Sequence, residues 1–463
     1  MGLRLTECYK KVMRKNNISL WICVGLVWGV CGMAASWCEA QTRAASTPTP
    51  KPSQDTAKLV TVVLERANEV TGGEFIDSTL SPPMLEEFRA ATGNVLFRES
   101  TTTIECDTAV QFLTTRKIHV VGNVKIVRDT VTITGYEGIY FPDARRSELK
   151  KDVTLSDTKV LLKSDSGIYL SNQRCAIFSG NVSLKDSASM VFCDSLVYFR
   201  DNARSQVFRN VRLINFADNA IITGGYAEHF NNSGYSFIIQ QPLLTKIDST
   251  QNGKIDTLLI RAVRMDSYRG QRDSVPRVEM QDSVKIRWGT DLYAKAKNAT
   301  YRLKDQKILL YGQPIVWFER SQLTGDSIVV QLKEREKKLR IEKVYVYRNA
   351  FLVSKDSLDK TGLKFSQVSG VDMVITFDDS SRIQQADVYK QARSLYYTYD
   401  GTKPRGANAS SGDEINIYFR NNRVRRIRIR GDVEGEQYPE RLLFRKDLNL
   451  PGFQWRETEK PVL

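Results

Sequence analysis

Histidine is scarce in this sequence, and the common catalytic signatures are missing. The 463 residues include two histidines, His119 and His229, and neither has metal-binding neighbours at a useful spacing. A zinc site or a histidine-based catalytic site is therefore not expected. The chain also has no Gly-x-Ser-x-Gly elbow, P-loop or Rossmann fingerprint. These absences predict a protein that is not an enzyme and that needs neither a metal nor a cofactor.

Long apolar runs are also missing, with one exception near the amino terminus. Residues 18–35 are largely apolar, follow a basic segment and precede the small-x-small sequence Cys38-Glu39-Ala40. This pattern predicts a secretory signal peptide over residues 1–40. An uncleaved membrane anchor is the alternative, because the run is just long enough to span a bilayer. Residues 41–56 then form a Pro/Ser/Thr-rich linker.

The charge balance is basic, with a formal net charge of +15. In an exported protein this indicates an anionic partner, such as a phosphorylated lipid, an acidic glycan or a nucleic acid. A merely soluble surface would give the same balance. A nucleic acid is disfavoured, because the charges are dispersed and no aromatic stacking platform is evident.

What the sequence does contain is a repeat with a constant period of 29 residues. Glycine precedes three of the repeated dipeptides, and Lys151 and Arg209 precede the other two. A constant period indicates a stacked architecture, in which each unit buries its apolar face against its neighbours. The dipeptides are Asn94-Val95, Asn123-Val124, Asp152-Val153, Asn181-Val182 and Asn210-Val211.

Each 29-residue unit is predicted to contain two strands joined by Asp- or Asn-rich turns, for example at Asp157 and Asp186. Alternation within the strands sorts the side chains onto two faces, one of which is apolar. The predicted apolar strip consists of Val95, Phe97, Val124, Ile126, Val131, Ile133, Val153, Leu155, Val160, Leu162, Val182, Leu184, Val211 and Leu213.

The repeat predicts an all-β fold that resembles a solenoid. We expect regular repeats over residues 57–225, degenerate repeats that continue the stack over 226–440, and a carboxyl-terminal tail over 441–463. Residues 234–253 and 400–412 are expected to be loops. Short helices are expected over parts of 58–70 and 84–92, on weaker patterns.

The repeated carboxylates and cysteines have structural explanations. Asp107, Asp165, Asp194 and Asp326 follow the repeat, which is typical of turn or edge residues and not of a catalytic pair. Cys106 and Cys193 share a register three repeats apart. Strands about 4.8 Å apart would separate them by at least about 14 Å, which is too far for a disulfide. We expect these cysteines to be small core residues.

Two segments resemble the OstA-like family, which includes the LptA-type proteins of lipopolysaccharide transport. In residues 91–126 and 312–328 a Gly-Asn-Val or Gly-Gln-Pro motif is followed by alternating apolar residues and then an aspartate. The resemblance covers roughly residues 58–440. It implies a twisted, open β-jellyroll whose apolar groove carries lipopolysaccharide or lipid A through the periplasm to the outer membrane. It also implies inner- and outer-membrane transport components as partners, with edge-to-edge self-association.

The residues themselves agree with a lipid carrier, although other functions fit some of them. Arg426, Arg428 and Arg430 are candidate contacts for lipid phosphates, or alternatively a solvated strand edge. A structural or adhesive exported β-solenoid with a sealed core is the main alternative, because apolar residues mostly form packed cores. A carbohydrate-active β-helix enzyme would require paired carboxylates that do not follow the repeat.

Overall fold

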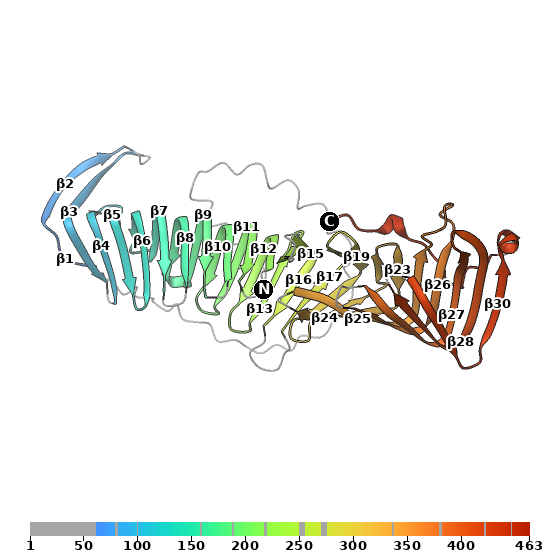
Figure 1. The fold of residues 1–463 in the computed structure, drawn as a ribbon. Helices are drawn as coiled ribbons and strands as arrows, with labels where there is room; N and C mark the ends of the chain where they lie inside the picture. Colours follow the sequence, from blue (N-terminus) through green and yellow to red (C-terminus); the bar gives the residue numbers. More distant parts are fainter. Residues whose placement is uncertain are drawn as a thin grey trace, which may run out of the picture. The chain divides into compact units, whose positions relative to one another are not determined.

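The computed structural model describes residues 62–78, 82–99, 101–157, 160–187, 189–216, 220–249, 255–269, 276–335, 338–378, 382–420, 423–445 and 447–463. These residues belong to one compact unit, Val60–Leu463. The predicted signal peptide and linker lie outside the described residues. Thirty strands of the described part form one hydrogen-bonded antiparallel network (Figure 1). The prediction of an all-β, repeat-built jellyroll is confirmed.

The first part of the network is a meander in which each strand from β3 to β12 pairs with the next (Figure 1). Two strands make one 29-residue unit, as the sequence predicted. Their bounds are β1 Val63–Arg66, β2 Glu69–Asp77, β3 Met84–Glu99, β4 Thr102–Phe112, β5 Lys117–Arg128, β6 Val131–Phe141, β7 Arg146–Ser156, β8 Leu161–Leu170, β9 Cys175–Lys185, β10 Ser189–Phe199, β11 Arg204–Asn215 and β12 Ala220–Phe230.

The repeated dipeptide is a two-residue kink within a strand. In β5 the pairing with β6 runs through Val121 and resumes at Val124, which leaves Gly122 and Asn123 outside the ladder. Both have positive φ, +79° and +46°. Left-handed conformations suit glycine and asparagine, and an extra residue in a strand bends it and increases its twist. The kink therefore turns each long strand from one wall of the jellyroll into the other.

In the middle of the chain the kinks break the strands, and two separate ladders result. One runs from β12 through β13, β16, β17, β20, β21 and β24 to β25, and the other from β12 through β14, β15, β18, β19, β22 and β23 to β25. The bounds are β13 Tyr235–Ile239, β14 Leu243–Ser249, β15 Ile255–Arg261, β16 Arg264–Tyr268, β17 Arg277–Gln281, β18 Val284–Trp288, β19 Leu292–Ala296, β20 Asn298–Arg302, β21 Lys307–Tyr311, β22 Ile315–Phe318, β23 Ser321–Thr324 and β24 Ser327–Arg335.

Long strands return in the last part of the chain. These are β25 Lys338–Lys355, β26 Phe365–Phe377, β27 Ile383–Asp400, β28 Lys403–Arg420, β29 Arg423–Arg430 and β30 Glu434–Pro439. A 3₁₀ turn, η2 (Glu440–Arg445), leads into the tail, which contains η3 (Glu457–Glu459). The tail runs back along the molecule toward β19 (Figure 1).

Four local predictions were wrong. Residues 84–92 lie in β3, and the described part of 58–70 lies in β1 and β2, because pairing with neighbouring strands overrides a weak helical pattern. Residues 234–253 contain β13 and β14, where a kink at Gln240-Gln241 interrupts the alternation. Residues 400–412 begin β28, whose small and polar residues pair with β27 and β30.

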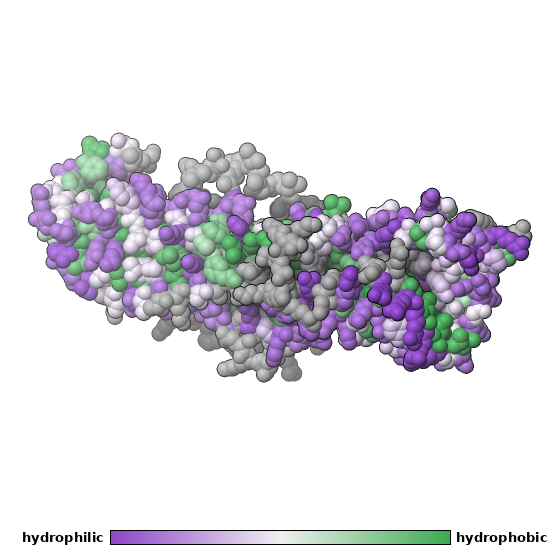
Figure 2. Space-filling model, in the orientation of Figure 1, coloured by the Kyte–Doolittle hydropathy of each residue, from purple (hydrophilic) through white to green (hydrophobic). Residues whose placement is uncertain are grey.

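The apolar residues form one core cluster that extends from Ala91 to Ile417. Cys106 and Cys193 lie in this cluster as free thiols, as predicted. Burial, aided by the adjacent aspartates, raises the pKa of each thiol to about 12. The face drawn in Figure 2 is a mosaic of hydrophilic and hydrophobic residues. The residues of the core cluster lie in the interior.

Candidate functional site

The kinks hold the interior residues in register through a repeated side-chain bond. The Asn123 amide donates to Asp107 on the preceding strand, with 2.9 Å between Nδ2 and Oδ2. The same bond joins Asn181 to Asp165, Asn210 to Asp194 and Asn349 to Asp326, at 2.9, 3.0 and 2.9 Å. The repeated carboxylates thus fix the kinks, as the sequence indicated.

A first apolar row runs across the strands. Each member of this row is the cross-strand partner of the next. The row passes from β1 to β26 through the amino-terminal meander and the second of the two ladders. Its members are Leu64, Phe97, Ile104, Ile126, Ile133, Leu155, Leu162, Leu184, Val191, Leu213, Ile222, Leu244, Ile260, Ile286, Ala294, Val316, Leu323, Leu352 and Val368.

A second apolar row crosses the other wall from β3 to β29. In its first part small and large residues alternate, which is how facing layers interdigitate. Its members are Ala91, Ala109, Val120, Gly138, Leu149, Gly167, Phe178, Leu196, Val207, Ala227, Ile238, Met265, Met280, Ala299, Leu310, Ile328, Val346, Met373, Val388, Ile415 and Ile429.

The predicted strip accounts for part of this interior. Val95, Phe97, Val124, Val153, Leu162, Val182 and Val211 are core residues, and Ile126, Ile133, Leu155 and Leu184 pack against them. Leu213 is a half-buried member of the first row. Val131 and Val160 are half-buried at the ends of hairpins.

The second row was missed, although it carries the same signal. Val120, Leu149, Phe178 and Val207 are also 29 residues apart. Each of these residues lies four positions before a dipeptide valine, so alternation alone places both on the same face.

The two rows face each other across small apolar cavities. One cavity, of about 60 Å³, lies between residues such as Ala294 and Leu323 of the first row and Leu310 of the second. Another, of about 40 Å³, lies between Ile133 and Phe178. The interior is therefore apolar on both sides and nearly filled by its own side chains.

The charged residues that follow row members in the sequence point to the outer side of the sheet. Glu228 and Asp266 lie on that side and are covered by neighbouring side chains. They bind Arg204 and Arg264, with 2.8 Å between Nη2 and a carboxylate oxygen in each pair. Burial by itself would raise the pKa of Glu228, but hydrogen bonds from Arg204, Tyr226 and Gln206 lower it. The Glu228 carboxylate is thus held ionised by its structural partners.

The three candidate phosphate contacts also lie on the outer surface. Arg426, Arg428 and Arg430 alternate along β29 with Ile427 and Ile429, which pack against the core. Arg426 lies over the Tyr418 ring at 5.3 Å, and Arg430 is 3.5 Å from Glu414. The structure thus separates these arginines from the apolar rows, and their contact with phosphate stays a prediction.

In the described part of the chain, no helix is long and apolar enough to cross a membrane, and no cluster of potential ligands is suited to a metal. The fold and its interior define a class: kinked antiparallel strands stacked around two facing apolar rows.

Comparison with known proteins agrees with this class. Residues 61–172 match the family described as OstA-like protein. Residues 250–336 match the family described as LptA/(LptD N-terminal domain) LPS transport protein. These two segments are therefore similar to the OstA-like and LptA-type proteins of lipopolysaccharide transport, the family that the sequence motifs had suggested.

Among solved structures, the chain is similar to LptH from Pseudomonas aeruginosa, described as the LptA homologous periplasmic component of the conserved lipopolysaccharide transport device. The match has 11% identity, covers 33% of this chain and 82% of that chain, and has a TM-score of 0.17. A search of curated proteins gave no match.

Proposed function

We propose that this protein is a non-enzymatic carrier that moves lipopolysaccharide through the periplasm to the outer membrane along its apolar interior. The observation that carries the proposal is the pair of continuous apolar rows, together with the two matched family segments. Acyl chains would lie between the rows, and the hydrophilic sugar would remain outside.

The uniformity of the rows suits transport better than storage. Each buried methylene contributes about 0.8 kcal/mol, so an acyl chain gains similar free energy at every position along equivalent rungs. The two cavities described between the rows are small, about 60 and 40 Å³. A lipid would therefore meet many comparable sites and no deep trap.

The ends of the strand network supply surfaces for partners. Within the described residues β2 pairs with β3 alone, and β29 and β30 each pair with β28 alone. Large apolar side chains such as Val70, Ile76 and Leu85 are exposed at the amino-terminal end. Unpaired edges accept further strands, so we propose that these ends join transport components or a second copy.

The remaining assignments complete the proposal. Residues 1–40 would direct export and 41–56 would act as a linker. Residues 57–225 and 226–440 would form one continuous lipid path, and 441–463 would be a distinct tail. Arg426, Arg428 and Arg430, on the outer surface, would contact phosphates of the lipid headgroup as it passes.

Photo-crosslinking in cells tests the proposal. A photoreactive amino acid would replace Ile126, Leu155 or Leu184 of the first row, and the exposed Lys125 would serve as the outward control. Adducts with lipopolysaccharide are expected from the inward positions alone. Efficient incorporation without lipid adducts at every inward position would contradict the carrier.

A sealed structural solenoid is the second candidate, and the small size of the cavities favours it. A sealed core excludes lipid, whereas a carrier must widen when lipid enters. The same crosslinking experiment separates the two, because a sealed core gives adducts at neither the inward nor the outward positions.

A further inference from the structure

The carboxyl-terminal tail, Asp447–Leu463, is docked as a strap on the outside of one wall. Its Glu459 carboxylate is 3.0 Å from the Lys295 ammonium of β19, and Lys460 lies over the Tyr293 ring at 4.1 Å. Further back, Phe453 and Trp455 pack on the Phe365 ring of β26 at centroid distances of 5.5 and 5.1 Å. The strap thus spans strands from β26 to β19.

Two buried glutamine side chains anchor the backbone of the strap. Gln322 in β23 is 2% exposed; its amide donates to the Gln454 carbonyl and accepts from the Arg456 N–H, both at 2.7 Å. Gln367 in β26 is fully buried; it donates to the Asn449 side chain and accepts from the Leu450 N–H at 2.9 Å. Buried amides are costly when unpaired, so these contacts favour the docked strap.

Beneath the strap lies an outward row of cross-strand partners. Trp317, Gln322, Val353, Gln367 and Leu395 follow one another across β22, β23, β25, β26 and β27. Each is at most 2% exposed. Their neighbours along the chain point inward, because side chains alternate in a strand.

Those inward neighbours line an interior cavity. Val316, Leu323 and Leu352 belong to the first apolar row and to the wall of the 60 Å³ cavity. The wall consists of short strands here, since β22 and β23 have four residues each. The strap therefore packs on the short strands of the wall that borders this cavity.

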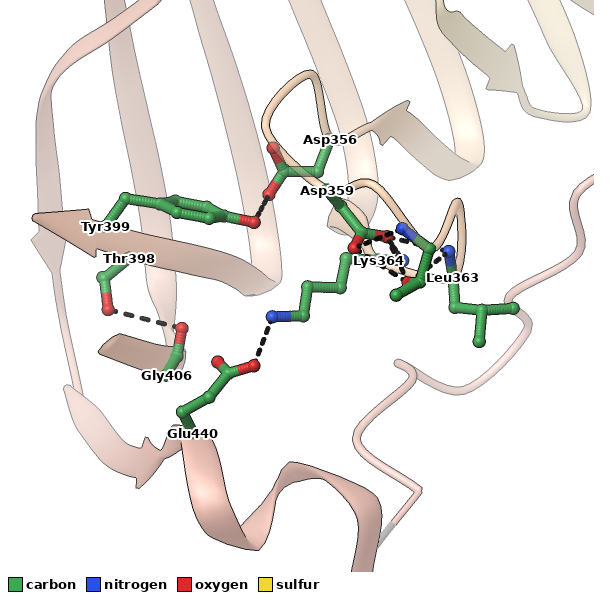
Figure 3. Close-up of polar contacts among 9 residues, drawn as sticks. Asp356, Asp359, Leu363, Lys364, Thr398, Tyr399, Gly406 and Glu440 are labelled. Carbon is green, nitrogen blue, oxygen red and sulfur yellow. Dashed lines mark hydrogen bonds and ion pairs between the residues drawn. The ribbon is translucent and has the colours of Figure 1, made fainter. Parts of the chain in front are cut away.

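The base of the strap is fixed by a separate clasp (Figure 3). The Lys364 ammonium, mostly buried, is 2.6 Å from the Glu440 carboxylate at the start of η2. Asp359 holds the loop that presents Lys364, because it accepts hydrogen bonds from the N–H groups of Thr361, Leu363 and Lys364. Phe365, the next residue, meets the strap itself.

The strap is attached to the wall by a few separate contacts and not along its whole length. A recess of about 850 Å³ separates Pro451, Gly452 and Gln454 from Asn349 and Arg393 at the kinks below. A segment fixed by a few anchors opens at lower free energy than the fold as a whole. The clasp would keep the base attached while the rest of the strap lifted.

We propose that Asp447–Leu463 is a releasable latch that holds this wall closed, and that its release lets the wall move and the interior admit an acyl chain. The first half of this proposal, that the segment is a latch, is supported by the contacts of the strap. The second half rests on the proposed function as a lipid carrier.

The test compares the full chain with the double variant Phe453→Ala/Trp455→Ala, with Gln331→Ala in β24 as a control on the other ladder. Hydrogen exchange in β19, β22 and β23 should accelerate by about tenfold or more in the double variant, with β5 to β8 unchanged. Uptake of the fluorescent fatty acid 11-(dansylamino)undecanoic acid should also become faster. Addition of a synthetic peptide of residues 447–463 should reverse both effects.

Each outcome decides one half of the proposal. Faster exchange in the strap alone, with β19, β22 and β23 unchanged, would overturn the latch. Faster exchange in the wall without faster uptake would overturn its role as a gate. Faster exchange in the wall with no probe bound by either protein would support the latch and contradict the carrier. If the double variant does not fold, Glu459→Gln weakens one anchor and serves in its place.

Discussion

At the scale of single residues, the kink is the feature that defines this fold. Pairs of positive-φ residues recur well beyond the regular repeats, for example at Asp282-Ser283, Gly312-Gln313 and Lys390-Gln391. Where the first residue of such a pair is not glycine, it is often a lysine or an arginine. Arg209 is 3.7 Å from Asp194 in this way, and Arg348 is 3.2 Å from Asp326. An ion pair thus accompanies a conformation that only glycine adopts freely.

Gly122 tests this interpretation. An alanine there would keep a φ of +79° and would place its Cβ 2.8 Å from the Asp107 Cγ. Gly122→Ala should lower the free energy of unfolding by about 1–2 kcal/mol, the cost of a left-handed L-residue. Gly122→Arg should cost less, by about 0.5 kcal/mol, because its guanidinium can pair with Asp107 as Arg209 does with Asp194. Urea unfolding measures both, and equal stability of Gly122→Ala and the parent would contradict the role of the glycine.

At the scale of elements, the sequence predicted the strands of the regular repeats but not the strap. The Asx turns at Asp157 and Asp186 are present, with 2.8 and 2.6 Å from each carboxylate to the N–H three residues on. These turns depend on residues close together in the chain, so the sequence alone predicts them. The contact between Gln322 and Arg456 joins residues 134 positions apart, and no local pattern encodes it.

The carboxyl end of the strap should respond to pH. Hydrogen bonds from Arg456 and Lys295 lower the pKa of Glu459 from its usual 4.5 to about 2, although burial acts in the opposite direction. Because the docked-state pKa is depressed, this contribution is complete above about pH 4.5 and is lost as the pH falls toward 2.

Hydrogen exchange of residues 453–460 should therefore show greater opening at pH 3 than at pH 6, after correction for the intrinsic rate. Glu459→Gln should open more than the parent at pH 6 and should change less between the two values. An identical pH response in both proteins would mean that Glu459 is not the titrating anchor. Asp359, whose pKa is also lowered to about 2, holds the clasp and is the matched comparison.

At the scale of the whole described unit, the repeat continues after residue 225 with altered spacing. Later kinks at Arg348-Asn349 and Gly431-Asp432 keep the geometry, while longer hairpins change the interval between them. The sequence revealed the period, the apolar strip and the family resemblance. It could not show that the two rows lie on walls that face each other, because that depends on the bend at a residue pair whose left-handed conformation is set by pairing with both neighbours.

If the two rows form one path, a block in the middle should divide it. Ala294, 2% exposed, lies in the first row beside the 60 Å³ cavity. Ala294→Phe would fill that space at a cost of about 1–3 kcal/mol of stability from overpacking. Lipid crosslinks at Leu155, before the block, and at Leu352, after it, should then differ: one persists and the other is lost.

The control is Lys285→Phe, on the outer side of β18 next to Ile286, which should leave both crosslinks unchanged. Undiminished crosslinks on both sides of a folded Ala294→Phe protein would mean that the two parts of the interior take up lipid independently, and the continuous path would be wrong.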